Sequence, residues 1–140
     1  MRRTLIPMAG GPHASLAATY IGVYRDSEEF EVTCCYVVSP DSSEEKRERD
    51  IQWIRKTMHL ANLEGKANLQ LLNGEKVATT LIRAAGDYDL IVMGASQEGL
   101  FSNVLFGEIP EKVARYSHTP VMIVQHYEGR VKSIIKRVMG

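Results

Sequence analysis

Apolar and polar positions along the chain follow two different periods, and the change from one to the other marks the elements. Short runs of apolar and β-branched residues predict strands at 4–8, 30–38, 67–72, 90–93 and 121–124. Apolar residues at helical spacing predict helices over 12–25, 42–64, 77–85 and 107–117. Strands and helices therefore alternate, which predicts right-handed βαβ units and a mostly parallel sheet in an α/β domain.

Polar residues and glycines mark the ends of the second helix. Ser42 and Glu45 form a capping-box pattern at its start, and Gly65 follows its last apolar residue. The mixed charges over 44–50 are typical of a solvated helix face. Trp53 on the same helix is interpreted as a packing residue.

The last residues have a pattern of their own. The apolar residues of the tail recur at intervals of three and four, which predicts an amphipathic helix with its cations on the other face; they are Val131, Ile134, Ile135, Val138 and Met139. The expected organisation is an α/β domain over 1–126 and a basic tail over 127–140. The tail either packs on the body or on a second subunit, or it lies on anionic lipid.

Composition and charge limit the partners. A chain of 140 residues fits one domain, and no apolar run approaches the length of a membrane-spanning helix. The net charge of zero divides into +4 after Gly129 and −4 before it, so the body has no basic surface for nucleic acid. Cys34 and Cys35 are adjacent in a predicted strand, where they point to opposite faces, and no zinc spacing is present. We therefore expect a cytoplasmic protein.

The candidate site follows the fourth predicted strand. The apolar run 90–93 ends at Gly94, a polar loop follows, and Gly107 opens the next helix. A loop that leaves a buried parallel strand and ends at a helix N-terminus is where α/β sheets usually hold an anion or a nucleotide. The sequence thus places a ligand site at 94–107.

Several short segments also resemble the universal stress protein family. They are Leu5-Ile6-Pro7, the run from Asp87 to Gly94, Gly107, the run from Glu111 to Ala114, and the run from Thr119 to Val124. The resemblance covers residues 3–125. It implies a single Rossmann-like domain with a five-stranded parallel sheet of order 3-2-1-4-5 and helices on both faces. It also implies a homodimer that pairs through the last strand, at Val121, Met122, Ile123 and Val124.

ATP-binding members of this family share a glycine pattern that this chain matches in part. The pattern is Gly, two residues, Gly, nine residues, Gly, then Ser or Thr. Gly94 and Gly107 fit the first and last glycines, but Gln97 stands at the middle one and Glu108 at the hydroxyl position. The resemblance implies a ligand site formed by Pro7, Ala9, Val38, Met93, Gly94, Gln97, Gly107, Glu108 and Ile109, in which Ala9 replaces an Asp near the ribose.

The two departures act against a triphosphate. The Cβ of Gln97 takes space and conformational freedom from a phosphate loop. The carboxylate of Glu108 repels phosphate by roughly 1 kcal/mol at 4 Å even in water, and the dipole of the following helix favours it as an anion of the protein's own. AMP or a nucleoside is therefore expected ahead of ATP in the usual family pose; both AMP and ATP stay open, and no cofactor is certain.

Other residues with chemical potential do not form a catalytic set. The four histidines are scattered without a partner at metal-ligand spacing. Ser96 and Ser102 lack the G-x-S-x-G elbow, and Asp87 and Asp89 are explained by turn chemistry. The sequence therefore predicts that the protein is not an enzyme.

Two functional hypotheses remain open at this stage. The first is a dimeric regulatory domain that senses a small adenine nucleotide. The alternative is a dimerisation domain that binds no nucleotide and regulates an attached or partner membrane transporter. The second is favoured by Ala9, Gln97 and Glu108. Its link to a transporter rests on the tail from Tyr127 to Arg130 onward, which resembles the ends of stress-protein domains of amino-acid or cation transporters.

Overall fold

A computed structural model describes residues 2–8, 30–95, 107–127 and 130–136. The elements along the chain are β1 (Arg2–Pro7), β2 (Phe30–Val38), α2 (Glu44–Leu60), β3 (Asn68–Asn73), α3 (Val77–Ala85), β4 (Leu90–Gly94), α4 (Glu108–Tyr116), β5 (Val121–Tyr127) and β6 (Arg130–Lys136). The five predicted strands and three of the predicted helices are confirmed. The helix predicted over 12–25 lies outside the described residues.

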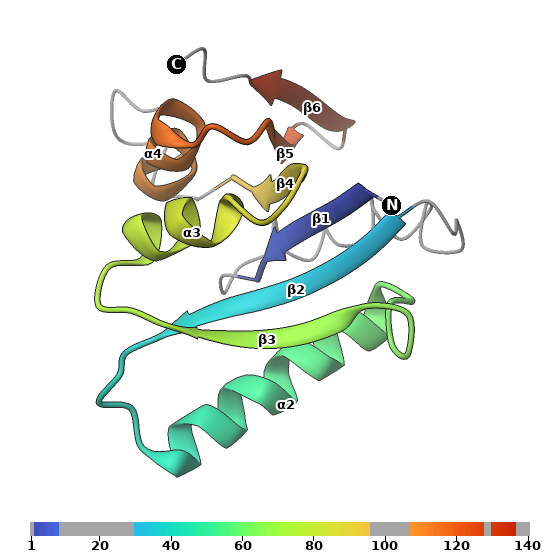
Figure 1. Cartoon of the computed structure of the whole chain (residues 1–140). Helices are drawn as coiled ribbons and strands as arrows, with labels where there is room; N and C mark the ends of the chain where they lie inside the picture. The colour runs from blue at the N-terminus through green and yellow to red at the C-terminus, as the bar shows by residue number, and fades with distance from the viewer. Residues whose placement is uncertain (1, 9–29, 96–106, 128–129, 137–140) are drawn as a thin grey trace.

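The strands form one sheet of order β3-β2-β1-β4-β5-β6 (Figure 1). The first five of these run parallel to their neighbours, in the predicted order 3-2-1-4-5. β6 adds a sixth, antiparallel strand at the outer edge of β5. The predicted five-stranded Rossmann-like sheet is thus confirmed, and one strand is added to it.

Helices cover both faces of this sheet (Figure 1). Ile54 and Met58 of α2 pack against one face together with Ile6 and Cys34. The other face packs against α3 and α4, with residues from both helices and from four strands; the cluster includes Leu5, Cys35, Leu81, Ile91, Val113 and Ile123. Neighbouring residues of a strand therefore enter opposite cores, which is why the central strands contain continuous apolar runs.

The ends of α2 differ from the predicted ones. Its N-cap is Ser43, whose side chain accepts a hydrogen bond of 3.1 Å from the backbone N–H of Lys46. The predicted pair of Ser42 and Glu45 is wrong by one residue, and a lysine at the third helical position cannot return the bond. The helix ends at Leu60, before Gly65, because Asn62 adopts the left-handed conformation with φ of 59°. Asn tolerates that conformation better than other residues with a Cβ.

The tail forms a strand over 130–136, so the predicted helix is wrong. A helix of this length is unstable alone, whereas the open edge of β5 offers a row of backbone partners. Only residues 128 and 129 join the two strands, and a two-residue connection that contains glycine is typical of a β-hairpin. The outer edge of Val121–Val124, which we expected to pair with a second copy, is hydrogen-bonded to β6 of the same chain.

Hydrogen bonds join the amino ends of β1 and β4 and engage the carboxylate of Asp89. The Asp89 carboxylate accepts from the backbone N–H of Arg3 at 2.8 Å, and the Asp89 N–H donates to the Arg3 carbonyl at 2.7 Å. The Arg3 guanidinium donates to the Asp87 carbonyl at 2.9 Å and stacks on the Tyr88 ring at 4.8 Å. These contacts hold the start of β1 against the residues that lead into β4.

Gly74 allows a close approach between the end of β3 and α3. A Cβ at this position would lie 1.8 Å from Oγ1 of Thr80 and 2.9 Å from its Cβ. Thr80 is buried and its hydroxyl donates to the Lys76 carbonyl at 2.7 Å, so it cannot turn away without losing that bond. The glycine is therefore required by space.

We predict that Gly74→Ala destabilises the fold by about 1–3 kcal/mol, because the extra methyl forces α3 away from β3. Gly86→Ala is the matched control, since a Cβ there meets only the Arg83 carbonyl at an ordinary 3.6 Å. Its effect should lie within about 1 kcal/mol of zero. Urea unfolding of both variants measures the difference. Equal midpoints for the two variants would contradict the steric argument.

The two cysteines should be unreactive in the folded protein. Burial raises the pKa of the Cys34 thiol to about 12, and burial, together with the neighbouring Cys34, also raises the pKa of the Cys35 thiol. Both thiols are fully buried in opposite cores. The reactive form of cysteine is the thiolate, so neither group should attack a reagent near neutral pH.

We predict that a thiol reagent at pH 8 labels both cysteines only after unfolding in denaturant. Because burial favours the neutral thiols, the stability they contribute is present below the ordinary pKa of 9.0 and is lost as the pH rises toward 12. Fast stoichiometric labelling of the native protein would show that the cores are open. Mass spectrometry with and without urea distinguishes the two results.

Candidate functional site

The order of the strands reverses between β1 and β4. β1 is followed along the chain by its neighbour β2, and β4 by β5 on the other side. In open α/β sheets, ligands bind outside the carboxyl ends of the strands at such a reversal. The register of Leu5 with Ile91 brings Pro7 and Met93, two residues further on, to the same level. We call the carboxyl ends of β1 and β4 with the start of α4 the switch-point site.

Backbone hydrogen bonds continue past the strand ends at this site. The Met8 N–H donates to the Cys35 carbonyl at 2.7 Å, and the Ala95 N–H donates to the Val124 carbonyl at 2.9 Å. Both residues are buried. The two segments that leave the sheet here therefore begin from fixed positions. Ala9 and Gln97, which follow directly, lie outside the described residues.

Gly107 supplies the conformation with which α4 begins. It is the N-cap of the helix, with φ of 104° and ψ of 157°. An L-residue with a Cβ rarely adopts this φ, so the position requires glycine. Its carbonyl accepts the first helical bond, from the N–H of Glu111 at 3.1 Å. The matched glycine of the sequence pattern is thus a helix start, as predicted.

The first turn of α4 is a limited anion site. Free N–H groups and the dipole make a helix start attractive to anions. Pro110 stands at the third helical position and has no N–H. At most three backbone donors remain for a ligand, from Gly107, Glu108 and Ile109. This number suits one phosphate better than a chain of three.

The Glu108 side chain forms an ion pair within α4. Its Oε1 is 3.2 Å from Nζ of Lys112, one turn along, and the side chain is 69% exposed. The expectation that Glu108 replaces a ligand anion stays a prediction. Lys112 also offsets the charge of the carboxylate, so the repulsion of a phosphate is weaker than the sequence alone indicates.

The predicted apolar residues Pro7, Val38 and Met93 are buried, and Ile109 is partly buried. Met93 packs in the cluster beneath α3 and α4, and Ile109 lies against the same cluster. Val38 ends β2, is buried, and accepts a hydrogen bond of 3.0 Å from the N–H of Gly74. These side chains hold the strand ends in place, and Pro7 is buried as well. Their contact with a ligand stays a prediction.

Arg47 is a residue that the sequence reasoning missed. Its Nη2 donates to Oδ1 of Asn73 at 2.8 Å and to the Ser39 carbonyl at 3.2 Å. Its Nε donates to the Ser42 carbonyl at 3.4 Å. The side chain thus ties α2 to the loop after β2 and to the end of β3. Arg47 lies one turn before Ile51 on the inward face of the helix. This spacing is the feature of the sequence that could have identified Arg47.

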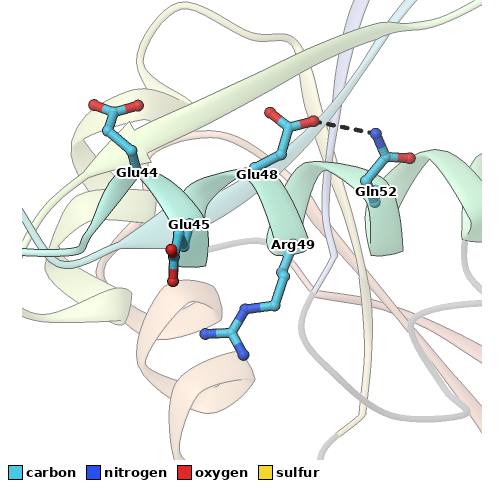
Figure 2. A pocket seen from close by; sticks show the side chains of 5 residues that line it. All are labelled: Glu44, Glu45, Glu48, Arg49 and Gln52. Atoms are coloured by element: carbon cyan, nitrogen blue, oxygen red, sulfur yellow. Dashed lines mark hydrogen bonds between the residues drawn. The ribbon is translucent and has the colours of Figure 1, made fainter.

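The rest of the charged run is exposed, as predicted, except for Asp50, which is partly buried. Lys46 and Asp50 form an ion pair of 2.8 Å one turn apart. Gln52 donates to Glu48 at 3.1 Å, on a face that also carries Arg49 (Figure 2). A shallow pocket over this face is lined by five side chains of α2 alone, namely Glu44, Glu45, Glu48, Arg49 and Gln52 (Figure 2). Nothing among the described residues indicates a ligand for this pocket.

The described residues contain no candidate metal cluster and no candidate membrane span. Within 2–8, 30–95, 107–127 and 130–136, no group of three or more His, Cys, Asp or Glu side chains could hold a metal ion. Over those ranges, no helix has the length and apolar character to cross a membrane.

Comparison with known proteins identifies the family. The model of the universal stress protein family matches residues 1–125. The chain therefore belongs to that family. A search of the curated proteins found no match.

Solved structures share this fold at low sequence identity. A universal stress protein in complex with cAMP is similar with a TM-score of 0.70 and 21% identity, over 88% of this chain and 96% of that one. A universal stress protein from Archaeoglobus fulgidus in complex with dAMP is similar with a TM-score of 0.67 and 15% identity, over 88% and 96%. A family protein from Arabidopsis thaliana with AMP bound is similar with a TM-score of 0.61 and 10% identity, over 91% and 94%.

We predict that Arg47→Ala destabilises the protein by about 1–3 kcal/mol, because several hydrogen bonds to a charged group are lost. Arg49→Ala is the control, since Arg49 lies on the exposed face of the same helix. Amide exchange should also become faster at Gly74, because its N–H donates a hydrogen bond to the Val38 carbonyl beside this loop. If both variants unfold at the same urea concentration, Arg47 does not tie the three elements together.

Proposed function

We propose that this chain is a regulatory binding module that senses an adenine nucleotide with a single phosphate at the switch-point site. The observation that carries the proposal is the reversal of strand order between β1 and β4 beside the glycine start of α4. Fixed strand ends and a helix start there provide backbone donors for a phosphate. The site needs no charged side chain to do so.

The size of the ligand follows from the first turn of α4 and from two side chains. Pro110 removes one donor from the helix start. Gln97 adds a side chain to a position where phosphate loops prefer glycine, and Glu108 adds a carboxylate. Each change disfavours a long polyphosphate more than a monophosphate. A nucleotide with one phosphate is therefore the expected ligand class.

The structural relatives support this class of ligand. Three of them are complexes with cAMP, dAMP and AMP, and each of these molecules contains adenine and one phosphate. Their identity to this chain is 10–21%, so the likeness itself extends only to the fold. The transfer of the ligand class to this chain is part of the proposal.

Binding without catalysis is the proposed activity. The two thiols of the chain are buried in the cores, with pKa values raised by that burial. Asp89 is engaged by the backbone of β1, far from the carboxyl ends of the strands. Neither kind of group is placed to act on a nucleotide at the switch-point site.

We predict that AMP raises the melting temperature of the protein and that ATP at equal concentration raises it less. A ligand at 100 times its dissociation constant stabilises a protein by about 2.7 kcal/mol. Thermal shifts with AMP, ATP and adenosine give the order, and mass spectrometry of undialysed protein detects a nucleotide that co-purifies. A larger shift with ATP than with AMP would contradict the proposed size of the ligand.

We also predict that Gln97→Gly combined with Glu108→Ser raises the affinity for ATP. The double variant restores the glycine and hydroxyl of the family pattern and removes one like charge from beside the phosphates. Glu48→Ser on the exposed face of α2 is the control for a lost surface carboxylate. Calorimetric titration should show tighter ATP binding in the double variant only. Unchanged ATP binding there would show that these side chains do not set ligand size.

The second candidate function is an interaction domain that binds no nucleotide. The observation that favours it is the set of departures from the ATP-binding pattern, at Ala9, Gln97 and Glu108. In this case the chain dimerises and regulates an attached or partner membrane transporter from the cytoplasmic side. Absence of any thermal shift with adenine compounds at millimolar concentration, with no co-purified nucleotide, supports this candidate over the first.

A further inference from the structure

We propose that β3, at one edge of the sheet, pairs with β3 of a second copy of this chain. In this dimer the two strands run antiparallel about a two-fold axis that passes through Gln70, perpendicular to the sheet. The two sheets then join into one. The inference concerns a strand that takes no part in the switch-point site, and it holds for either candidate function.

β3 lacks the features that usually protect the edge of a sheet. It ends the strand order on the side away from β6 (Figure 1). Natural edge strands are commonly protected by charged residues, by proline or by bulges. β3 contains no charge and no proline, and all six of its residues pair with β2 in continuous register. β6, at the other edge, carries Arg130, Lys132 and Lys136. Of the two edges, β3 is therefore the one suited to pairing with another strand.

The backbone groups that β3 directs outward belong to alternate residues. The N–H of Gly74 donates to the Val38 carbonyl in β2 at 3.0 Å. Because backbone groups alternate in direction along a strand, those of Gln70 also face β2, and those of Leu69 and Leu71 face outward. Among the described residues, none bonds to these outward groups. Pairing of Leu69 with Leu71 of the second copy, and the reverse, satisfies all of them.

The central side chains of β3 match their own two-fold copies. Leu69 and Leu71 pack against the core beneath α2, and in the dimer each lies opposite the other. Gln70 is exposed and lies opposite its own copy, where two amides can exchange a hydrogen bond. An axis through Leu71 instead would place Leu69 opposite Asn73, whose Oδ1 already accepts from Arg47. Since the strand is uncharged, self-pairing places no like charges opposite each other.

The charges of α2 are complementary to those of its own copy in this arrangement. α2 packs over β2 and β3 on one face of the sheet, so the two-fold axis brings a second α2 antiparallel to it on the same face. All acidic residues of α2 lie in 44–50, whereas 51–60 contains Arg55 and Lys56 and no acid. The acidic half of each helix is therefore directed toward the basic half of the other. Exposed charges of this kind select the orientation of a complex more than they add affinity.

Charges placed on the axis test the interface in the full-length chain. Gln70→Lys sets two like charges opposite each other and should lower the association constant on the order of tenfold in sedimentation equilibrium. Asn68→Lys is the control, because it adds the same charge to an exposed position of β3 away from the axis. Gln70→Lys mixed with Gln70→Glu should restore association, since opposite charges then meet. Equal association constants for the two lysine variants, no recovery in the mixture, or a monomeric wild-type protein at millimolar concentration would overturn the proposal.

A cysteine on the axis gives a second, covalent test. Gln70→Cys brings two thiols into a non-hydrogen-bonded pair, whose Cα atoms lie about 4.5 Å apart, within the range of a disulfide. Asn68→Cys is the control, because its two copies lie roughly 13 Å apart along the strands in this register. Cys34 and Cys35 are buried and do not compete. Oxidation should give covalent dimers of Gln70→Cys alone. Crosslinking of both variants equally, or of neither, overturns the proposal even when the protein is dimeric, because that dimer uses another surface.

Discussion

Burial of the central strands from both sides is the constraint on which the rest of the structure depends. Ile6 and Cys34 pack beneath α2, whereas their chain neighbours Leu5 and Cys35 pack beneath α3 and α4. Helices cover both faces of these strands, so a ligand can reach them only where the strands end. The reversal of strand order then selects the carboxyl ends of β1 and β4 from all the strand ends.

The constraint also explains how much could be predicted. Continuous apolar runs indicated the five parallel strands, and the family resemblance supplied their order. The tail was mispredicted because its spacing fits a helix, while the decisive factor was a vacant sheet edge elsewhere in the chain. Arg47 was missed because a run of charged residues on a helix usually indicates a face exposed to solvent. Only the positions of the neighbouring loop and of Asn73 show that Arg47 points toward them. Ala9 and Gln97 lie outside the described residues.

The switch-point site draws its chemistry from the backbone more than from side chains. Gly107 sets the conformation of the helix start, and Pro110 removes a donor from it. Glu108 turns to Lys112 on the surface. A site of this kind can change its ligand through substitutions that leave the fold intact, because the scaffold depends on the apolar strands. Under the proposed function, the positions where this chain departs from the family pattern bear on ligand size rather than on architecture.

The contacts of Arg47 have a mechanical consequence. They hold the loop after β2, the end of β3 and the first turns of α2 together. Ile54 and Met58 in the core fix the following turns of this 17-residue helix. At 1.5 Å per residue, Leu60 lies roughly 20 Å along the axis from Arg47. α2 thus connects the loop after β2 with an apolar side chain that is 72% exposed at its far end.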